Sequence, residues 1–450
     1  MRKFLKWTGI VLLPSIAIVL AANAYFVWTT DAQLERQLAA IRAAGDPVTI
    51  AELAPKPIPP EKNANTYLRQ ANADVEAVDA LLYSRMSDSD DKEWEESYGV
   101  WSARNPHSLM PLKLQKKVKA IFAAHPNAIP LLEKAAACPD YDAQLDYAML
   151  VKETVDCMQP SREPRFPRLL PDVLMKIRNA ARVLMCRGNL LVAEGNRDEA
   201  VRTALAIFRL SHHCRHAFGA ITYLVSDTIA EIAVNCANNA LQAGPISPDV
   251  RQALDAELAS QERMEGIVQA IKNERAFIIE LFQNLPLRNF WLISRWRWNE
   301  WESECLDELQ AFLAMLNDEK SYSETVEAIR RIEAIRPQKD KIIMMGIVGM
   351  QNIHQANANA QARIRCLRIL NALQTHVLLD RAVVPKLADL GLPLKTTTDP
   401  FSGEPLHIKK IPNGWLVYSV GLNLQDDGGK IDDYQTDVGV GPPPLATKPD

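Results

Sequence analysis

An uncharged stretch at residues 7–28 limits what this chain can fold into more than any other feature. As a helix rising about 1.5 Å per residue it would span roughly 33 Å, and the hydrocarbon core of a bilayer is about 30 Å thick. Tyr25, Phe26 and Trp28 would then lie at one membrane interface, where amphipathic aromatic rings collect. We therefore predict that residues 7–28 form a transmembrane anchor.

The charges that flank this stretch predict its orientation. Arg2, Lys3 and Lys6 precede it, and Asp31 and Glu35 follow it. The positive-inside rule places the basic end in the cytoplasm. We therefore expect a single-pass protein with a cytoplasmic tail at residues 1–6 and an extracytoplasmic body, in the periplasm of a bacterial cell envelope.

A cleaved signal peptide is the alternative interpretation of the same stretch. Ala22-Asn23-Ala24 has the small-x-small form of a cleavage site. We favour an uncleaved signal anchor, because the apolar stretch continues past this site and the following residues prolong the same helix. Both interpretations export the body of the protein.

The composition is that of an ordinary folded protein, with 48% hydrophobic and 24% charged residues. Only 18 glycines occur in 450 residues, which favours long helices with few tight turns. A net charge of −4 gives no electrostatic reason to expect a nucleic-acid partner. The seven cysteines include no C-x-x-C pair, and Cys138 and Cys157, which flank a short helical stretch, are the candidate disulfide.

We predict a helix followed by a spacer at residues 29–62. Leu34, Leu38 and Ile41 share one side of an amphipathic helix that ends at Gly45-Asp46-Pro47. The proline-rich residues 48–62 are typical of a semi-rigid linker. We expect an extracytoplasmic helical domain to follow at residues 63–337.

Helical periodicity is strongest between residues 171 and 243. Leu174, Ile177 and Leu184 recur at helical spacing, and Glu194-Gly195-Asn196 predicts a turn into a second helix. A third helix is expected to end near residue 243. This pattern resembles a helical hairpin of the tetratricopeptide type, without the repeated period of about 34 residues that a solenoid needs.

A tryptophan-rich segment lies at residues 289–302. Trp291, Trp298 and Trp301 share one helical face, which favours a buried core stripe. A membrane-surface contact and a groove for a partner are the alternatives. Acidic side chains such as Glu300 and Glu304 on the opposite face argue against a surface-seeking helix, which would carry lysine and arginine there.

We predict a long helix followed by a β-hairpin at residues 338–435. The helix, expected at residues 341–381 with a break near Gly346 or Gly349 as an alternative, carries an apolar stripe from Ile364 to Val377. Pro412-Asn413-Gly414 is a hairpin turn signal between two alternating segments. Because an isolated hairpin is marginal in water, we expect this one to pack on the long helix. Residues 436–450 are expected to be a disordered tail.

Two groups of residues could hold a metal ion. Asp426, Asp427, Asp432 and Asp433 surround two glycines, and such a flexible loop could fold oxygen ligands around calcium. The alternative is an ordinary solvated acidic tail. His212 and His216, in a cluster with His213 and Cys214, stand at i and i+4 on a predicted helix and could bind a metal from one face. The alternative interpretation is that these are ordinary polar residues near the end of a helix.

The order of the C-terminal motifs carries a resemblance. A long helix, the connector LADLGLP, then D-P-F-S-G-x-P-L, a hairpin, Y-S-x-G and an acidic D-D-G-G loop resemble the tail of the major pseudopilin of type II secretion. The chain also resembles, over most of its length, a family of uncharacterised bacterial membrane-anchored helical proteins, through AGDPVTIAELAP and AEGNRDEA. The first resemblance implies calcium binding by Asn423 and the acidic loop. The processed pilin leader is missing at residues 1–28, so the pilin assembly role is not carried over.

Together these features predict a mainly α fold: a multi-helix array with helical hairpins, an N-terminal transmembrane helix, and a C-terminal long helix with a small antiparallel β-hairpin. We expect a non-enzymatic, membrane-anchored scaffold or interaction protein whose partners are the membrane and other envelope proteins. The alternatives are an accessory of a type II secretion or pilus-like system and an envelope metal-dependent hydrolase. No G-x-S-x-G, P-loop or G-x-G-x-x-G motif occurs in the sequence.

Overall fold

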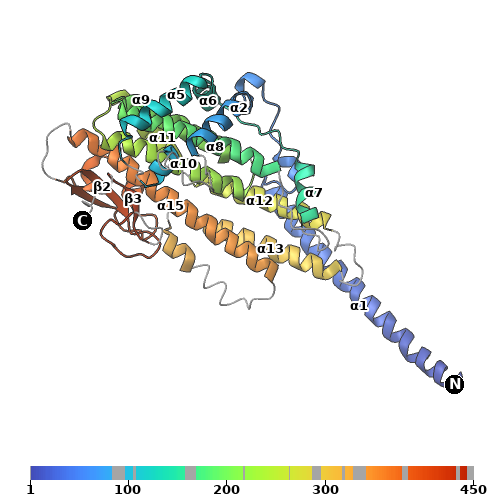
Figure 1. The fold of residues 1–450 in the computed structure, drawn as a ribbon. Coiled ribbons are helices and arrows are strands. Elements are labelled where there is room, and N and C mark those ends of the chain that lie inside the picture. Colours follow the sequence, from blue (N-terminus) through green and yellow to red (C-terminus); the bar gives the residue numbers. More distant parts are fainter. Residues whose placement is uncertain are drawn as a thin grey trace, which may run out of the picture.

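The computed structural model describes residues 2–83, 97–104, 108–157, 169–215, 218–262, 264–285, 295–316, 320–327, 341–377, 384–431 and 436–442. These residues form a mainly helical protein with one small antiparallel sheet near the C-terminal end, as predicted (Figure 1). The helices of the body are α2 (Ala64–Tyr83), α4 (Tyr98–Arg104), α5 (Leu112–Ala124), α6 (Ala128–Ala137), α7 (Tyr147–Cys157), α8 (Leu169–Ala193), α9 (Arg197–Arg215), α10 (Ala220–Gln242), α11 (Pro248–Gln261), α12 (Glu265–Asn284), α13 (Arg295–Met315) and α15 (Lys341–Val377).

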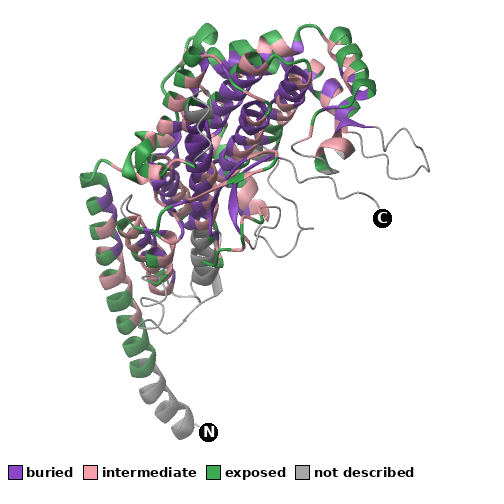
Figure 2. Ribbon diagram, turned by 90° about the vertical axis from the view of Figure 1, so that its left-hand side faces the viewer, coloured by how far each residue is buried: buried purple, intermediate pink, exposed green. Residues whose placement is uncertain are grey.

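A single helix, α1 (Arg2–Ala43), joins the apolar N-terminal stretch to the body of the protein. Its first half projects away from the other helices, and its apolar side chains from Ile16 to Trp28 are exposed (Figures 1 and 2). Its second half buries Leu34, Leu38 and Ile41 in one cluster with side chains of α12 and α13. Residues 14–43 are long and apolar enough to cross a membrane, judged by length and composition.

Residues 48–62, predicted to be a spacer, begin against the body of the protein. After the turn at Gly45 (φ 76°) the chain folds back onto the body, where Val48 and Ile50 are buried. Two short 3₁₀ helices follow, η1 (Ile50–Leu53) and η2 (Pro60–Lys62). The start of this proline-rich stretch therefore packs on the body of the protein, whereas most side chains of residues 51–62 are exposed.

The predicted helical hairpin is confirmed as α8 and α9, and the third helix, α10, packs against both. Gly195 adopts φ 83° in the connecting turn, a conformation that glycine takes without steric cost. Leu184, Ala200 and Ala204 are fully buried. The small alanines let the helices approach closely, and the leucine stripe fills the space between them.

The long helix α15 runs through both glycines without a break and ends at Val377. Three strands follow it, β1 (His407–Ile411), β2 (Gly414–Ser419) and β3 (Val438–Val440), in the antiparallel order β1-β2-β3. Strand β3 lies in the stretch expected to be a disordered tail. That expectation is wrong for residues 436–442, because Val438 and Val440 are apolar side chains that the sheet buries.

The sheet packs on α15, as predicted. Trp415 and Val417 of β2 lie in the same buried cluster as Leu367 and Leu370 of the helix. The motif Asp399-Pro400-Phe401 forms the joint between the two elements. Asp399 accepts hydrogen bonds from Phe401 N, Ser419 Oγ and Val420 N at 2.8–2.9 Å, and Phe401 is fully buried.

Candidate functional site

The acidic loop after β2 is partly organised by hydrogen bonds. Asp426 accepts from Tyr418 Oη at 3.0 Å and from the Gly428 N–H at 2.9 Å, and the bond from Gly428 holds the pKa of Asp426 below its usual value. Buried Asp437 accepts the N–H groups of Asp427 and Gly429 at 3.3 and 2.6 Å. Sequence analysis missed Asp437 because it lies in the segment expected to be disordered.

The predicted calcium ligands are not all placed. Asp426 and Asp427 lie in the loop, whereas Asp432 and Asp433 fall outside the described residues. Within the described ranges, no group of three or more histidine, cysteine, aspartate and glutamate side chains is arranged to hold a metal ion. The calcium site therefore stays a prediction.

Among the described residues of the histidine cluster, the side chains do not point toward a common site. His213 is buried and stacks on Tyr141, with ring centroids 5.9 Å apart, whereas His212 is exposed. Cys214 directs its Sγ to the carbonyl of Thr222 at 3.5 Å. His216 lies outside the described residues, so the i, i+4 pair with His212 is untested.

The disulfide prediction is wrong, and the tryptophan stripe is confirmed in part. None of the seven cysteines, all of which lie in the described part of the chain, forms a disulfide, and Cys138 directs its Sγ toward the Glu61 carbonyl. Trp298 is buried and donates its indole N–H to Phe282 O at 3.0 Å. Trp301 is half-buried beside it, with ring centroids 5.7 Å apart. Trp291 lies outside the described part of the chain.

A cavity of about 610 Å³ lies between α15, residues 320–327 and the connector at residues 394–404. It is lined by both apolar and polar side chains. The polar ones on α15 are His354, Asn357, Gln361 and Arg365, spaced three or four residues apart so that they share one helical face. This cavity is the candidate binding site that the geometry defines.

The polar face continues along the whole described C-terminal half of α15, and its members are less than 10% exposed: His354, Asn357, Gln361, Arg365, Arg368, Asn371 and Gln374. Several of them donate to backbone carbonyls of other segments. Gln361 bonds to Gln261 O, Asn371 to Arg251 O and Gln374 to Leu241 O, at 2.9–3.0 Å. The face therefore ties α15 to both ends of α11 and to the last turn of α10. The carbonyls of Gln261 and Leu241 lie at helix C-termini, where carbonyls lack intrahelical partners.

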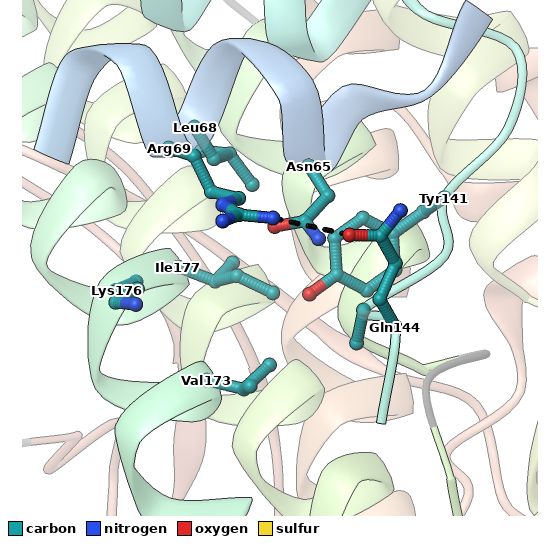
Figure 3. A pocket seen from close by; sticks show the side chains of 9 residues that line it. Asn65, Leu68, Arg69, Tyr141, Gln144, Val173, Lys176 and Ile177 are labelled. Carbon is teal, nitrogen blue, oxygen red and sulfur yellow. Dashed lines mark hydrogen bonds between the residues drawn. The ribbon is translucent and has the colours of Figure 1, made fainter. Parts of the chain in front are cut away.

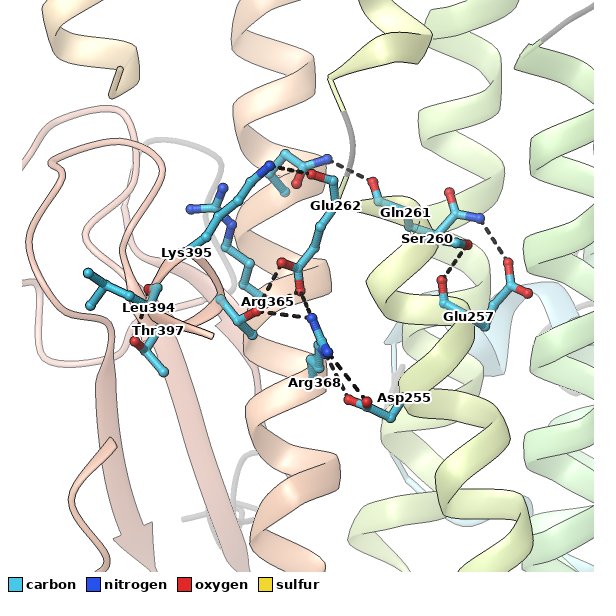
Figure 4. Close-up of polar contacts among 12 residues, drawn as sticks. Asp255, Glu257, Ser260, Gln261, Glu262, Arg365, Arg368, Leu394, Lys395 and Thr397 are labelled. Carbon is cyan, nitrogen blue, oxygen red and sulfur yellow. Dashed lines mark hydrogen bonds and ion pairs between the residues drawn. The ribbon is translucent and has the colours of Figure 1, made fainter. Parts of the chain in front are cut away.

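A charged network lies next to the cavity, which Lys395 also lines, and Figure 4 shows its contacts. Arg368 donates to Asp255 at 2.7 and 3.3 Å and to Glu262 at 3.1 Å, and Thr396 Oγ1 also bonds Glu262. Lys395 donates to the Glu262 carbonyl at 2.8 Å. Arg368 and Glu262 are both nearly buried, so their ion pair offsets part of the cost of removing two charges from water.

His354 has unused hydrogen-bonding capacity in this cavity, and the Oε1 atom of Gln361 also has no partner among the described residues. His354 is 5% exposed, stacks on Tyr322 at 5.0 Å, and has no hydrogen-bond partner for either ring nitrogen among the described residues. Burial lowers the pKa of His354 to about 4, so the imidazole is neutral at pH 7. A neutral imidazole can give one hydrogen bond and accept one from a bound polar molecule.

A smaller cavity of about 210 Å³ lies between the start of α2, the 141–144 loop and the start of α8 (Figure 3). Arg69 donates to Gln144 Oε1 at 3.1 Å across its mouth, and Tyr141 forms one wall. Gln144 adopts φ 56°, a left-handed conformation that is uncommon without glycine. Arg69 and Gln144 already bond each other and the volume of this cavity is about a third of the other, so the larger cavity is the stronger candidate.

Comparison with known proteins adds no relative from which a role could be taken. No protein-family model, no curated protein and no solved structure matches this chain. The candidate site therefore rests on geometry alone. Its sequence signal was the spacing of polar residues at positions 354, 357, 361, 365 and 368, which sequence analysis overlooked in favour of the apolar stripe on the same helix.

Proposed function

We propose that this protein is a single-pass, membrane-anchored scaffold or interaction protein with its body outside the cytoplasm. One observation carries the proposal. In α1, exposed apolar side chains from Ile16 to Trp28 continue directly into buried Leu34, Leu38 and Ile41. Apolar surface of this extent favours lipid over water, and the same helix is built into the body, so the anchor and the domain form one unit.

The orientation follows from the charges at the two ends of the apolar stretch. Arg2, Lys3 and Lys6 precede it and Asp31 follows it. The excess of basic residues at the start favours a cytoplasmic N-terminus. The scaffold would then present the cavity beside His354 to molecules of the cell envelope, where partner proteins or small polar ligands could reach it.

Protease treatment of intact cells from which the outer layers have been removed tests this orientation. We expect added proteinase K to digest the body of the full-length chain while a control cytoplasmic protein stays intact. Protection of the body until the cells are lysed would overturn the proposed topology. If the body were digested but all of the protein were in the soluble fraction, with no membrane-bound fragment, the proposed anchor would be wrong.

A role as an accessory of a type II secretion or pilus-like system is the second candidate. The observation that favours it is the packing of the three-stranded sheet on α15 through the Asp399–Phe401 joint, since the resemblance implies a long helix with a sheet on its C-terminal half. Chemical cross-linking in cells that express such a system tests it. Recovery of secretion components with the wild-type chain, and loss of them when residues 384–450 are deleted, would support it.

A further inference from the structure

Helices α1 and α13 run side by side in the same direction. The ring centroids of Phe26 and Trp296 lie 5.4 Å apart, and Asn299 donates to Asp31. Further along, Gln37 donates to Asp307 Oδ1 at 2.7 Å. The contacts advance together along the two helices, so the Phe26–Trp296 contact places the first turn of α13 level with Phe26. Figure 1 shows the two helices side by side.

The position of Phe26 along α1 gives the depth of this first turn. At about 1.5 Å per residue, the helix from residue 7 to residue 26 spans roughly 30 Å, the thickness of a bilayer core. Phe26 then lies where the acyl chains meet the headgroups. Tyr25, Phe26 and Trp28 are 59%, 47% and 69% exposed, so a large part of each ring surface stays open although Trp296 packs against Phe26.

The first turn of α13 has the composition of an interfacial segment. Trp296 is half-buried against Phe26, and Arg297 lies 6.0 Å from the Trp296 ring and 5.8 Å from the Trp301 ring. Arg295 is 53% exposed and pairs with Asp31 at 3.0 Å. Tryptophan and tyrosine collect at headgroup level, and long basic side chains reach from there toward phosphates and water.

We propose that Tyr25, Phe26, Trp28 and Trp296 form an aromatic collar that is embedded in the headgroup layer of the membrane that α1 crosses. The collar rests on the proposed anchor and adds to it a second membrane contact, about 270 positions later in the sequence. Its occupant is lipid, because the rings are continuous with the apolar surface of α1. Because α1 and the first turn of α13 would both contact the membrane, they would fix the height and tilt of the body above it. A single helix could not fix both.

Photo-cross-linking to lipid tests the collar. The full-length chain is placed in nanodiscs of phosphatidylethanolamine and phosphatidylglycerol, with benzoylphenylalanine at one position at a time, and lipid adducts are measured by mass spectrometry. Val19 lies in the span and is 66% exposed. Ala314, also exposed, lies 18 residues after Trp296 on α13, about 27 Å further from the membrane.

We expect lipid adducts at Val19 and Trp296 and at least tenfold fewer at Ala314. Adducts at Val19 without adducts at Trp296 would overturn the collar and leave the anchor standing, with the ring surface open to a protein partner. No adducts at Val19 would overturn the proposed anchor itself. Equal yields at Trp296 and Ala314 would also contradict the collar. Arg295→benzoylphenylalanine, at the exposed neighbouring position, repeats the measurement if the Trp296 variant melts at a lower temperature than wild type.

Discussion

Asp46 accepts a hydrogen bond from Arg275 Nη2 at 2.7 Å, and the arginine side chain is only 1% exposed. Lys272 Nζ lies 2.7 Å from the other carboxylate oxygen, and Arg275 also donates to Gln310 of α13 at 3.0 Å. Asp46 is the third residue after the end of α1. This pair therefore fixes the end of the anchoring helix to α12 and, through the same guanidinium, to α13.

Replacing Asp46 should loosen the attachment of α1. Asp46→Ala leaves the Arg275 charge buried without its carboxylate, and we expect a loss of roughly 3 kcal/mol in the free energy of unfolding, measured by urea denaturation of the full chain in detergent. Lys119→Gln, which breaks an exposed ion pair with Glu194, is the matched control and should leave stability nearly unchanged. Equal effects of the two variants would contradict the role of the Asp46–Arg275 pair.

The same pair predicts an acid dependence. Burial alone would raise the pKa of Asp46, but the hydrogen bonds from Lys272 and Arg275 outweigh it, so the pKa is lowered. Its contribution to stability is therefore present above the ordinary aspartate pKa near 3.9 and is lost as the pH falls through the lowered value. The difference in stability between wild type and Asp46→Ala should shrink below about pH 4 and stay constant from pH 5 to 7.

Local patterns in the sequence predicted much of this fold, because helical periodicity and turn residues act over a few positions. Leu184, Gly195 and the hairpin turn at Asn413-Gly414 were placed correctly for that reason. Asp46 was visible only as part of a turn, since its partner Arg275 is 229 residues away. The polar face of α15 is visible in the sequence as a spacing, but its partners are not, because several are backbone carbonyls and others, such as Asp255, lie more than 100 residues away.

The crossing of α8 and α10 depends on the absence of a side chain at Gly188. An added methyl group would overlap Sγ of Cys236, which is fully buried. We expect Gly188→Ala to cost about 1–3 kcal/mol by overpacking. Adding Cys236→Ala should recover most of that loss, because the methyl group then fills the space that the sulfur leaves. A double-mutant cycle by thermal denaturation measures the coupling, and additive effects would contradict this packing.

His354→Phe should stabilise the protein at pH 7 by about 1 kcal/mol or more. Phenylalanine keeps the stack on Tyr322 and removes a buried polar ring that has no hydrogen-bond partner among the described residues. The unfolded chain protonates this histidine near pH 6.5, and the folded chain only near pH 4. Wild type should therefore lose stability between these values as the pH falls, and the variant should lose less.

Asp227→Asn is the control for that pH dependence, because its effect has the opposite sign. Burial raises the pKa of Asp227 to about 7, against an opposing effect of Arg215. Its contribution to stability is present below the ordinary aspartate pKa and is lost as the pH rises toward 7. If His354→Phe and Asp227→Asn changed the pH profile of urea denaturation in the same direction, one of these two assignments would be wrong.

Calcium should raise the melting temperature of the full chain if the acidic loop binds it as predicted. Binding stabilises the folded state by RT ln(1 + [L]/Kd), and extracellular modules bind calcium at about 10⁻⁴–10⁻³ M. We expect a higher melting temperature in 5 mM calcium, about five times the upper Kd, than in chelator. The response should disappear in Asp426→Asn with Asp427→Asn. Equal melting temperatures for wild type in both conditions would leave the loop an ordinary solvated segment.

The central claim is that α1 is an uncleaved anchor built into the body of the protein. The most direct test is the intact mass of the protein recovered from the membrane and soluble envelope fractions after alkaline carbonate extraction. We expect one species, which lies in the membrane fraction and retains residues 1–28. A soluble exported species whose first residue is Tyr25, the product of cleavage after Ala22-Asn23-Ala24, would contradict it.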